Sequence, residues 1–132
     1  MKTRTLFLLL FSLGYFAMGQ ETMSDNKKGM TKVAIMYPGG EGHTFDMDYY
    51  ATKHMPMVAD LFGESLRHWS IDKGVSGRTP GEPITYIAIG YFYFDSIQAY
   101  GEAFGPNAEK ILSDIPNYTN IQPVVQINEV IR

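Results

Sequence analysis

Apolar and polar positions along this 132-residue chain form blocks whose period changes several times. Short runs rich in β-branched and aromatic residues predict strands, whereas longer stretches with apolar residues three and four apart predict helices. The predicted strands are residues 32–37, 66–73, 84–94 and 121–131, and the predicted helices are residues 44–62, 96–104 and 108–115. Only Gly105-Pro106 separates the last two stretches, so they count as one interrupted helix and the order is β-α-β-β-α-β.

The first helical stretch carries an apolar stripe that contains a histidine. Its inward-facing positions are Met47, Tyr50, Ala51, His54, Val58 and Leu61. Asp46 and Asp48 fall in the first turn, where carboxylates complement the helix dipole, and Gly63 follows as a C-cap residue. Pro56 removes a backbone donor from the middle of the stretch, so we expect a kink or a break there.

The second helical stretch begins with the pattern of a capping box, Asp95-Ser96-Ile97-Gln98, in which Asp95 is the expected N-cap residue. Pro116 ends the helix. The residues expected on its apolar faces are Ile97, Tyr100, Phe104, Ile111, Leu112 and Ile115.

The strand at residues 84–94 is apolar on both faces. The alternation places Tyr86, Ala88, Gly90 and Phe92 on one face and Ile87, Ile89, Tyr91 and Tyr93 on the other. The element order predicts the α+β class and a ferredoxin-like sandwich, with two helices on one face of a four-stranded antiparallel sheet. The helices cover one face only, so something else must cover the second. A second copy, giving a homodimeric α+β barrel, is one candidate, and a ligand on the concave face is the other.

The N-terminus has the three parts of a secretory signal. Lys2 and Arg4 precede an uncharged apolar run that ends at Ala17-Met18-Gly19, where small residues suit a signal peptidase. The run is shorter than the roughly 20 residues that a membrane-spanning helix needs. We therefore expect a signal peptide at 1–19, a flexible lead-in at 20–30 and one domain at 31–132. This arrangement predicts export to the periplasm or medium without stable membrane insertion, whereas a start at Met30 would give a cytoplasmic protein.

Composition narrows the function classes further. The chain has no cysteine, which excludes disulfides, thiolate metal sites and a cysteine nucleophile. Its 11 basic residues are outnumbered by 14 acidic ones, which argues against a nucleic-acid partner. Its three histidines lie 11 and 14 residues apart, so no helical pair of metal ligands exists and we expect no metal site. No nicotinamide, flavin or phosphate-loop pattern is visible, and no cofactor is evident.

His54 is the sharpest chemical candidate, because an imidazole on a buried stripe can act as acid or base beside a pocket. A hydrogen-bonded core histidine is the alternative interpretation. Tyr50, one turn before it, is a second candidate catalytic residue that would donate a proton or orient a substrate. The candidate substrate-binding residues are Tyr49, His68, Asp72, Tyr86 and Asn117; for most of them packing, solvation or turn formation is the competing role. Asp114 is expected to hold the turn beside Asn117.

Two motifs resemble the EthD family, named for ethyl tert-butyl ether degradation. They are Tyr49-Tyr50 with His54 and Pro56 on the first helix, and the segment from Asp114 to Pro123, DIPNYTNIQP. The likeness covers about residues 30–132. It implies a dimeric α+β barrel and an oxidoreductase activity, since members are often called EthD-type reductases, although similar domains include fungal pigment-pathway dehydratases. Related barrels bind haem, so haem with His54 as its axial ligand stays open. An export signal is atypical of the family's degradative role.

Two functions from different classes follow. The first is an oxidoreductase that acts on a small hydrophobic or oxygenated organic compound with His54 as acid/base, or else a cofactor-independent dehydratase or isomerase. The second is a non-catalytic module that binds a small hydrophobic molecule. A purely structural dimer, with the second sheet face used wholly in self-contact, is a third reading.

Overall fold

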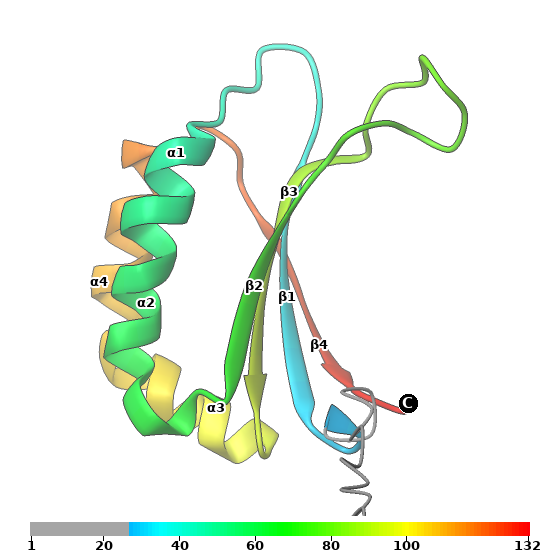
Figure 1. Cartoon of the computed structure of the whole chain (residues 1–132). Coiled ribbons are helices and arrows are strands. Elements are labelled where there is room, and N and C mark those ends of the chain that lie inside the picture. Colours follow the sequence, from blue (N-terminus) through cyan, green and yellow to red (C-terminus); the bar gives the residue numbers. More distant parts are fainter. Residues whose placement is uncertain (1–26) are drawn as a thin grey trace, which may run out of the picture.

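The computed structural model describes residues 27–132 as one antiparallel sheet with helices on one face (Figure 1). The strands are β1 (Thr31–Pro38), β2 (His68–Lys73), β3 (Tyr86–Phe94) and β4 (Val124–Glu129), in the spatial order β2-β3-β1-β4. This is the ferredoxin-like arrangement of the α+β class, as the sequence predicts. The expected signal peptide lies outside the described residues.

Strand register sends two sets of side chains from β1 and β3 to opposite faces. Val33 pairs with Phe92 and Tyr37 pairs with Ala88, and all four side chains are buried on the face that the helices cover. The register shifts between Tyr37 and Pro38, where Pro38 pairs with Tyr86, so Ile87 is the additional residue of a β-bulge. The expected position of Tyr86 beside Ala88 is therefore wrong. The bulge turns Tyr86 to the open face, because side chains alternate only along an uninterrupted strand.

The first helical region consists of three segments with different hydrogen-bond periods. These are α1 (Met47–Tyr49), the π-helical turn η2 (Tyr50–His54) and α2 (Met55–Phe62), followed by the 3₁₀ turn η3 (Gly63–Ser65). Asp46 is the N-cap, since its carboxylate accepts a hydrogen bond from the Tyr49 amide at 3.0 Å. Pro56 lies in the first turn of α2, where its missing N–H is tolerated. The expected break is confirmed and takes the form of a change in helical period.

The second helical region is also divided. Helix α3 (Ile97–Phe104), the turn η4 (Gly105–Asn107), helix α4 (Ala108–Asp114) and the turn η5 (Ile115–Asn117) follow one another. The expected N-cap is wrong by one residue: Ser96 caps α3 by accepting from the Ala99 amide at 3.1 Å. Asp95 instead accepts two hydrogen bonds from the Arg67 guanidinium. Ile97 and Leu112, expected to face inward, are each 53% exposed.

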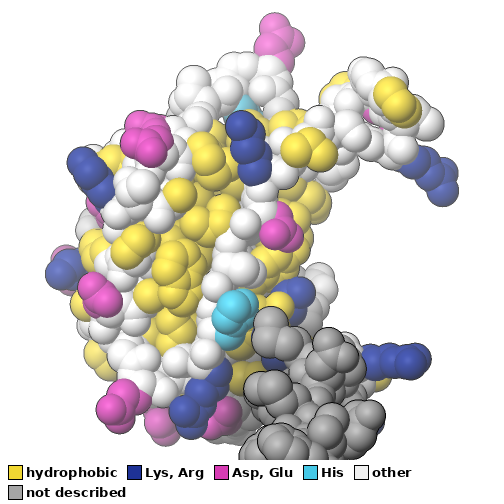
Figure 2. Space-filling model, in the orientation of Figure 1, with side chains coloured by type: hydrophobic (Ala, Val, Ile, Leu, Met, Phe, Trp, Pro, Cys, Tyr) yellow, Lys and Arg dark blue, Asp and Glu magenta, His cyan; other side chains and the backbone are white. Residues whose placement is uncertain are grey.

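The core fills the space between the helices and the sheet, where it includes Val33, Tyr50, Val58, Phe92 and Ile111. Apolar side chains between α2 and the β2 edge remain visible at the surface (Figure 2), which agrees with the partial burial of Met57, Leu61, Trp69 and Ile71. The loop between β2 and β3 projects beyond the sheet (Figure 1). No helix among residues 27–132 is both long enough and apolar enough to cross a membrane.

The end of the expected lead-in is ordered. The Gly29 amide donates to the Val130 carbonyl at 2.7 Å, and the Val130 amide donates to the Met30 carbonyl at 2.9 Å. These bonds extend the pairing of β1 with β4, so the domain includes a turn before residue 31.

Candidate active site between the helices and the sheet

The π-helical turn η2 places His54 in the core, where only 4% of the residue is exposed. Its Nδ1 lies 2.8 Å from Oδ2 of Asp114, which ends α4 sixty residues later. The Tyr50 ring lies one helical turn before the imidazole and stacks on it with 17° between their planes. Single π turns within α-helices often occur at functional sites. The sequence-predicted pair of Tyr50 and His54 is therefore brought together, with a carboxylate at one end.

Asp114 is the centre of a small polar network. Its Oδ1 accepts hydrogen bonds from the Tyr49 hydroxyl at 2.8 Å and from Asn117 Nδ2 at 2.9 Å, while Oδ2 faces His54. Asn117 belongs to η5, which begins one residue after Asp114, so the tight turn places its amide under the carboxylate. Three of the sequence-predicted site residues, Tyr49, His54 and Asn117, thus meet on one carboxylate.

The pKa values of the dyad define its protonation. Burial lowers the pKa of His54 below its ordinary value of 6.5, and this outweighs the opposing hydrogen bond and charge of Asp114. Burial acts to raise the pKa of Asp114, but the hydrogen bonds from Asn117, His54 and Tyr49 together hold it below 3.8. At neutral pH the carboxylate is ionised and can only accept, so the neutral imidazole carries its proton on Nδ1. Its Nε2 then carries a lone pair and makes no hydrogen bond to the described residues.

Aromatic rings enclose the imidazole on the sheet side. Tyr118 lies 4.6 Å from the His54 ring, and its hydroxyl is 2.6 Å from that of Tyr37 on β1. Phe45 contacts Tyr37, Tyr50 and Tyr118 in edge-to-face geometry. Burial raises the pKa of Tyr37 and of Tyr118, so both phenols are neutral hydrogen-bonding groups at any physiological pH.

Tyr50 is the exception within this cluster. The residue is fully buried, yet its hydroxyl makes no hydrogen bond within residues 27–132. The hydroxyl lies directly against Gly90 of β3, where a Cβ would be 2.2 Å from the oxygen. Gly90 is thus required for the tyrosine to reach the sheet. A buried and unpaired hydroxyl costs free energy, which makes it a candidate group for contacting a ligand.

A surface hollow of about 450 Å³ lies next to this cluster. Its lining includes Asn117, which donates to Asp114, and Tyr118, which contacts His54. The opposite wall contains Thr44, Phe45 and Asp46 from the loop before α1. Two hydrogen bonds of Asn120, from the Thr44 amide and to the Gly42 carbonyl, fasten that loop across the hollow.

Three sequence-predicted site residues lie elsewhere. His68 pairs with Tyr93, Asp72 pairs with Ile89, and Tyr86 follows the bulge, so all three side chains belong to the open face of the sheet. They cannot contact a molecule that touches His54, because the sheet separates them. An association of Asp72 with a histidine is not found: the carboxylate lies near Tyr91, whose pKa it helps to raise after the larger effect of burial.

Neither a metal nor a haem is supported by this donor set. Residues 27–132 contain no group of three histidine or carboxylate side chains that could hold a metal ion. The His54 imidazole is enclosed by Tyr50 and Tyr118, so a macrocycle bound to it would have to displace both rings. The residues present do not fit a haem.

Sequence reasoning assigned Asp114 only to a turn and passed over Tyr37 and Tyr118. Tyr37 ends a strand and Tyr118 precedes one, so each looks like ordinary packing. The signal for Asp114 was present in the second motif, where Asp114 stands three residues before Asn117. The pairing of this motif with His54 depends on the distance between two helices, which spacing within either helix does not contain.

The fold and site define a ferredoxin-like α+β sandwich with a buried histidine–aspartate pair facing a tyrosine cluster. The EthD domain model matches residues 38–122, which include every residue of this network except Tyr37, and the chain belongs to the EthD family. An EthD-like protein from Ralstonia eutropha is 41% identical over 80% of this chain and 95% of its own, with a TM-score of 0.76. An EthD family protein from Bacillus halodurans shares the fold at 16% identity and a TM-score of 0.53, over 76% of this chain and 97% of its own. No curated protein matches the chain.

Proposed function

We propose that this EthD family protein is an enzyme that transfers protons on a small, oxygenated, largely hydrophobic organic molecule, with His54 as the acid/base. The observation that carries the proposal is the hydrogen bond from His54 to an ionised carboxylate, Asp114, which itself accepts two further hydrogen bonds. Such a carboxylate fixes the tautomer of the imidazole and stabilises the cation that forms when Nε2 takes a proton.

The surrounding residues suit an apolar substrate that carries an oxygen atom. The imidazole is bordered by aromatic rings, while the unpaired Tyr50 hydroxyl offers a donor to a carbonyl or hydroxyl oxygen. In this mechanism His54 removes a proton from carbon or oxygen, Tyr50 donates to the substrate oxygen, and the imidazolium returns the proton to the product. Dehydration and isomerisation need only these steps, and an EthD-type oxidation or reduction needs them in addition to a redox partner.

Substrate access requires a movement at the hollow beside Asn117. Phe45 and Tyr118 lie in van der Waals contact between the hollow and the imidazole, with ring centres 5.5 Å apart. Phe45 belongs to a loop with few core contacts of its own, held largely by hydrogen bonds to the segment around Asn120. We infer that displacement of Phe45 opens the site, and that the substrate enters past Asn117.

The test uses proton exchange, which does not require the natural substrate. A panel of small cyclic ketones and hydroxyketones is incubated with the protein in D₂O, and deuterium incorporation and dehydration are followed by NMR. We expect a catalysed exchange that His54→Gln removes and that Asp114→Asn reduces about 10²-fold, a typical magnitude for general acid–base catalysis. His68→Gln is the matched control, because His68 lies on the opposite face of the sheet.

The same panel separates catalysis from binding alone. Full exchange activity in a folded His54→Gln variant would refute the assignment. Saturable binding of a panel member without any chemical change would favour the non-catalytic binding module instead, for which the enclosure of the imidazole is the supporting observation.

Two further expectations belong to this proposal. The open face of the sheet carries Met36, Ile89, Tyr91 and Tyr93 without a helix over it, which supports a homodimer packed sheet to sheet. A monomer at micromolar concentration in light scattering would contradict the dimer. Export rests on the first 19 residues and predicts a mature chain that begins at Gln20, which mass spectrometry of the protein from its native host measures directly.

A further inference from the structure

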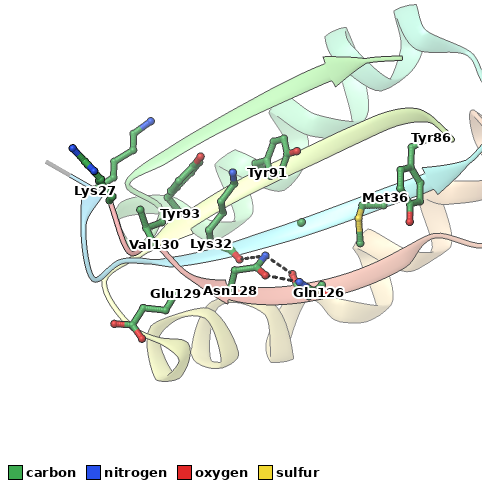
Figure 3. Close-up of a pocket in the computed structure, with 12 residues that line it drawn as sticks. Lys27, Lys32, Met36, Tyr86, Tyr91, Tyr93, Gln126, Asn128, Glu129 and Val130 are labelled. Atoms are coloured by element: carbon green, nitrogen blue, oxygen red, sulfur yellow. Dashed lines mark hydrogen bonds between the residues drawn. The ribbon is translucent and has the colours of Figure 1, made fainter. Parts of the chain in front are cut away.

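The open face of the sheet contains a second hollow, a groove of about 830 Å³. Its floor and walls come from β1, β3, β4 and the two chain segments that flank them (Figure 3). The volume lies within the range of sites that bind small molecules. The sheet separates this groove from His54, so it is distinct from the proposed active site.

The two ends of the groove differ in chemistry. At one end the ammonium of Lys32 lies 4.1 Å from the centre of the Tyr91 ring and 5.6 Å from that of Tyr93, and the ammonium of Lys27 lies 4.6 Å from Tyr93. At the other end are Met36 and Tyr86, which Figure 3 shows side by side. Lys32 and Met36 are four residues apart on β1, so the cationic and apolar ends are separated by about 13 Å.

The cationic end has no compensating carboxylate in the described part of the chain. Arg132 also lines the groove, and neither it nor the two lysines forms an ion pair among residues 27–132. Glu129 is the one acidic residue in the lining, and its carboxylate points away from the lysines (Figure 3). Its register explains this direction, because Glu129 pairs with Thr31, whose side chain belongs to the helix-covered face. The field of Lys27 also reaches His68, whose pKa is lowered by burial and then by this lysine.

The wall on β4 is polar and preorganised. Gln126 donates to the Asn128 side chain at 2.6 Å, and Asn128 donates to the backbone carbonyl of Lys32 at 3.3 Å. These bonds use one N–H of each amide and leave the other available to a ligand oxygen. A local excess of positive charge and of amide donors is unexpected in a chain whose acidic residues outnumber its basic ones.

We propose that this groove is a binding site for a planar aromatic carboxylate, with the carboxylate between Lys27 and Lys32 and the ring directed toward Met36 and Tyr86. The lysines already lie over tyrosine faces, so an incoming carboxylate pairs with cations held in place by the sheet. The flat apolar floor selects a flat ligand. All the groove residues come from one chain, and the site is independent of the chemistry at His54.

Calorimetric titration of the full mature chain with 2-naphthoate tests the site, and uncharged 2-naphthamide is the matched ligand. We expect 2-naphthoate to bind and the amide to bind at least tenfold more weakly. Lys32→Gln weakens naphthoate binding by a similar factor, and the double variant Lys27→Gln/Lys32→Gln removes it. Raising the salt concentration weakens naphthoate binding and leaves that of the amide unchanged.

A matched variant controls for the loss of one positive charge. Lys53 also lies over a tyrosine ring, 5.3 Å from the centre of Tyr49, but on the helix side of the molecule. Lys53→Gln therefore leaves naphthoate binding unchanged, and so does His54→Gln. Equal binding of the two ligands, an equal effect of Lys32→Gln and Lys53→Gln, or no binding of naphthoate would each overturn the proposal. None of these results bears on proton transfer at His54, so the two proposals fail separately.

Discussion

The two faces of the sheet show how one strand serves two different environments. Strand β3 sends Gly90 and Phe92 under the helices and Tyr91 and Tyr93 to the open side. On the covered face the hydroxyls and the imidazole are satisfied by other side chains, as in the contact between Tyr37 and Tyr118. On the open face the aromatic rings are covered by lysine side chains. Aromatic content alone therefore does not distinguish a core from a recognition surface; the groups that contact the rings do.

The largest effect should come from Gly90→Ala on the covered face. The new Cβ would lie 2.2 Å from the Tyr50 hydroxyl, so helix or strand must move. We expect a loss of about 3 kcal/mol in the free energy of unfolding, measured by urea denaturation. Gly101→Ala is the matched control, because a Cβ there meets nothing within 4 Å and alanine favours the helix. Adding Tyr50→Phe to Gly90→Ala should restore part of the loss, and an absence of any restoration would contradict the contact.

The second effect separates paired from unpaired hydroxyls within the tyrosine cluster. Tyr118→Phe leaves the Tyr37 hydroxyl buried without its 2.6 Å partner and should cost about 1–2 kcal/mol of unfolding free energy. Tyr50→Phe removes a hydroxyl that has no partner in the described chain, so it should be neutral or stabilising. Thermal denaturation of the two variants measures the difference. Equal destabilisation would show that Tyr50 has a partner in solution.

The third effect is a loss of stability in acid. The pKa of His54 is lowered on folding, so below pH 6.5 the unfolded chain binds the proton more tightly and stability falls. The pKa of Asp114 is also lowered, so its contribution is present above pH 3.8 and is lost as pH falls through the folded value. One proton gives a slope of at most about 1.4 kcal/mol per pH unit. Urea denaturation from pH 7.5 to 5 should show this slope, and His54→Gln should flatten it. A slope unchanged in that variant would assign it elsewhere, to His68 for example.

The smallest effect should come from Lys32→Gln on the open face. Its cation–aromatic contacts are partly exposed, so their loss should cost about 0.5 kcal/mol of unfolding free energy. A loss as large as that of Tyr118→Phe would mean that the two faces are not distinguished by their energetics. The stability of the free protein is the measurement, since a ligand in the groove would add its own binding energy.

Much of the fold could be predicted from the sequence, because element type follows from local period. The break at Pro56 and the C-cap at Gly63, whose φ is 57°, were both readable from single residues. The cap at Ser96 was missed because Asp95 is an equally good cap in isolation, and Arg67, distant in sequence, engages its carboxylate. The exposure of Leu112 was missed because the helical pattern around it does not say where the sheet ends.

The site was half predictable for the same reason. His54, Tyr49 and Asn117 stand in motifs with local spacing, and the structure brings them together on Asp114. His68 and Asp72 were drawn to the site by residue type alone, and the strand register places them behind the sheet. Tyr86 has the right chemistry in the wrong place, since a single unpaired residue decides its face.

That unpaired residue, Ile87, has a consequence for comparisons among related chains. A relative whose β3 lacks the bulge has one residue fewer between the loop and Ala88, so the correct alignment contains a one-residue gap inside a strand. An ungapped alignment would match Tyr86 with a residue that points into the core. Any inventory of groove residues across the family must therefore be counted backward from Gly90 and forward from Pro38, with Ile87 left unassigned between them.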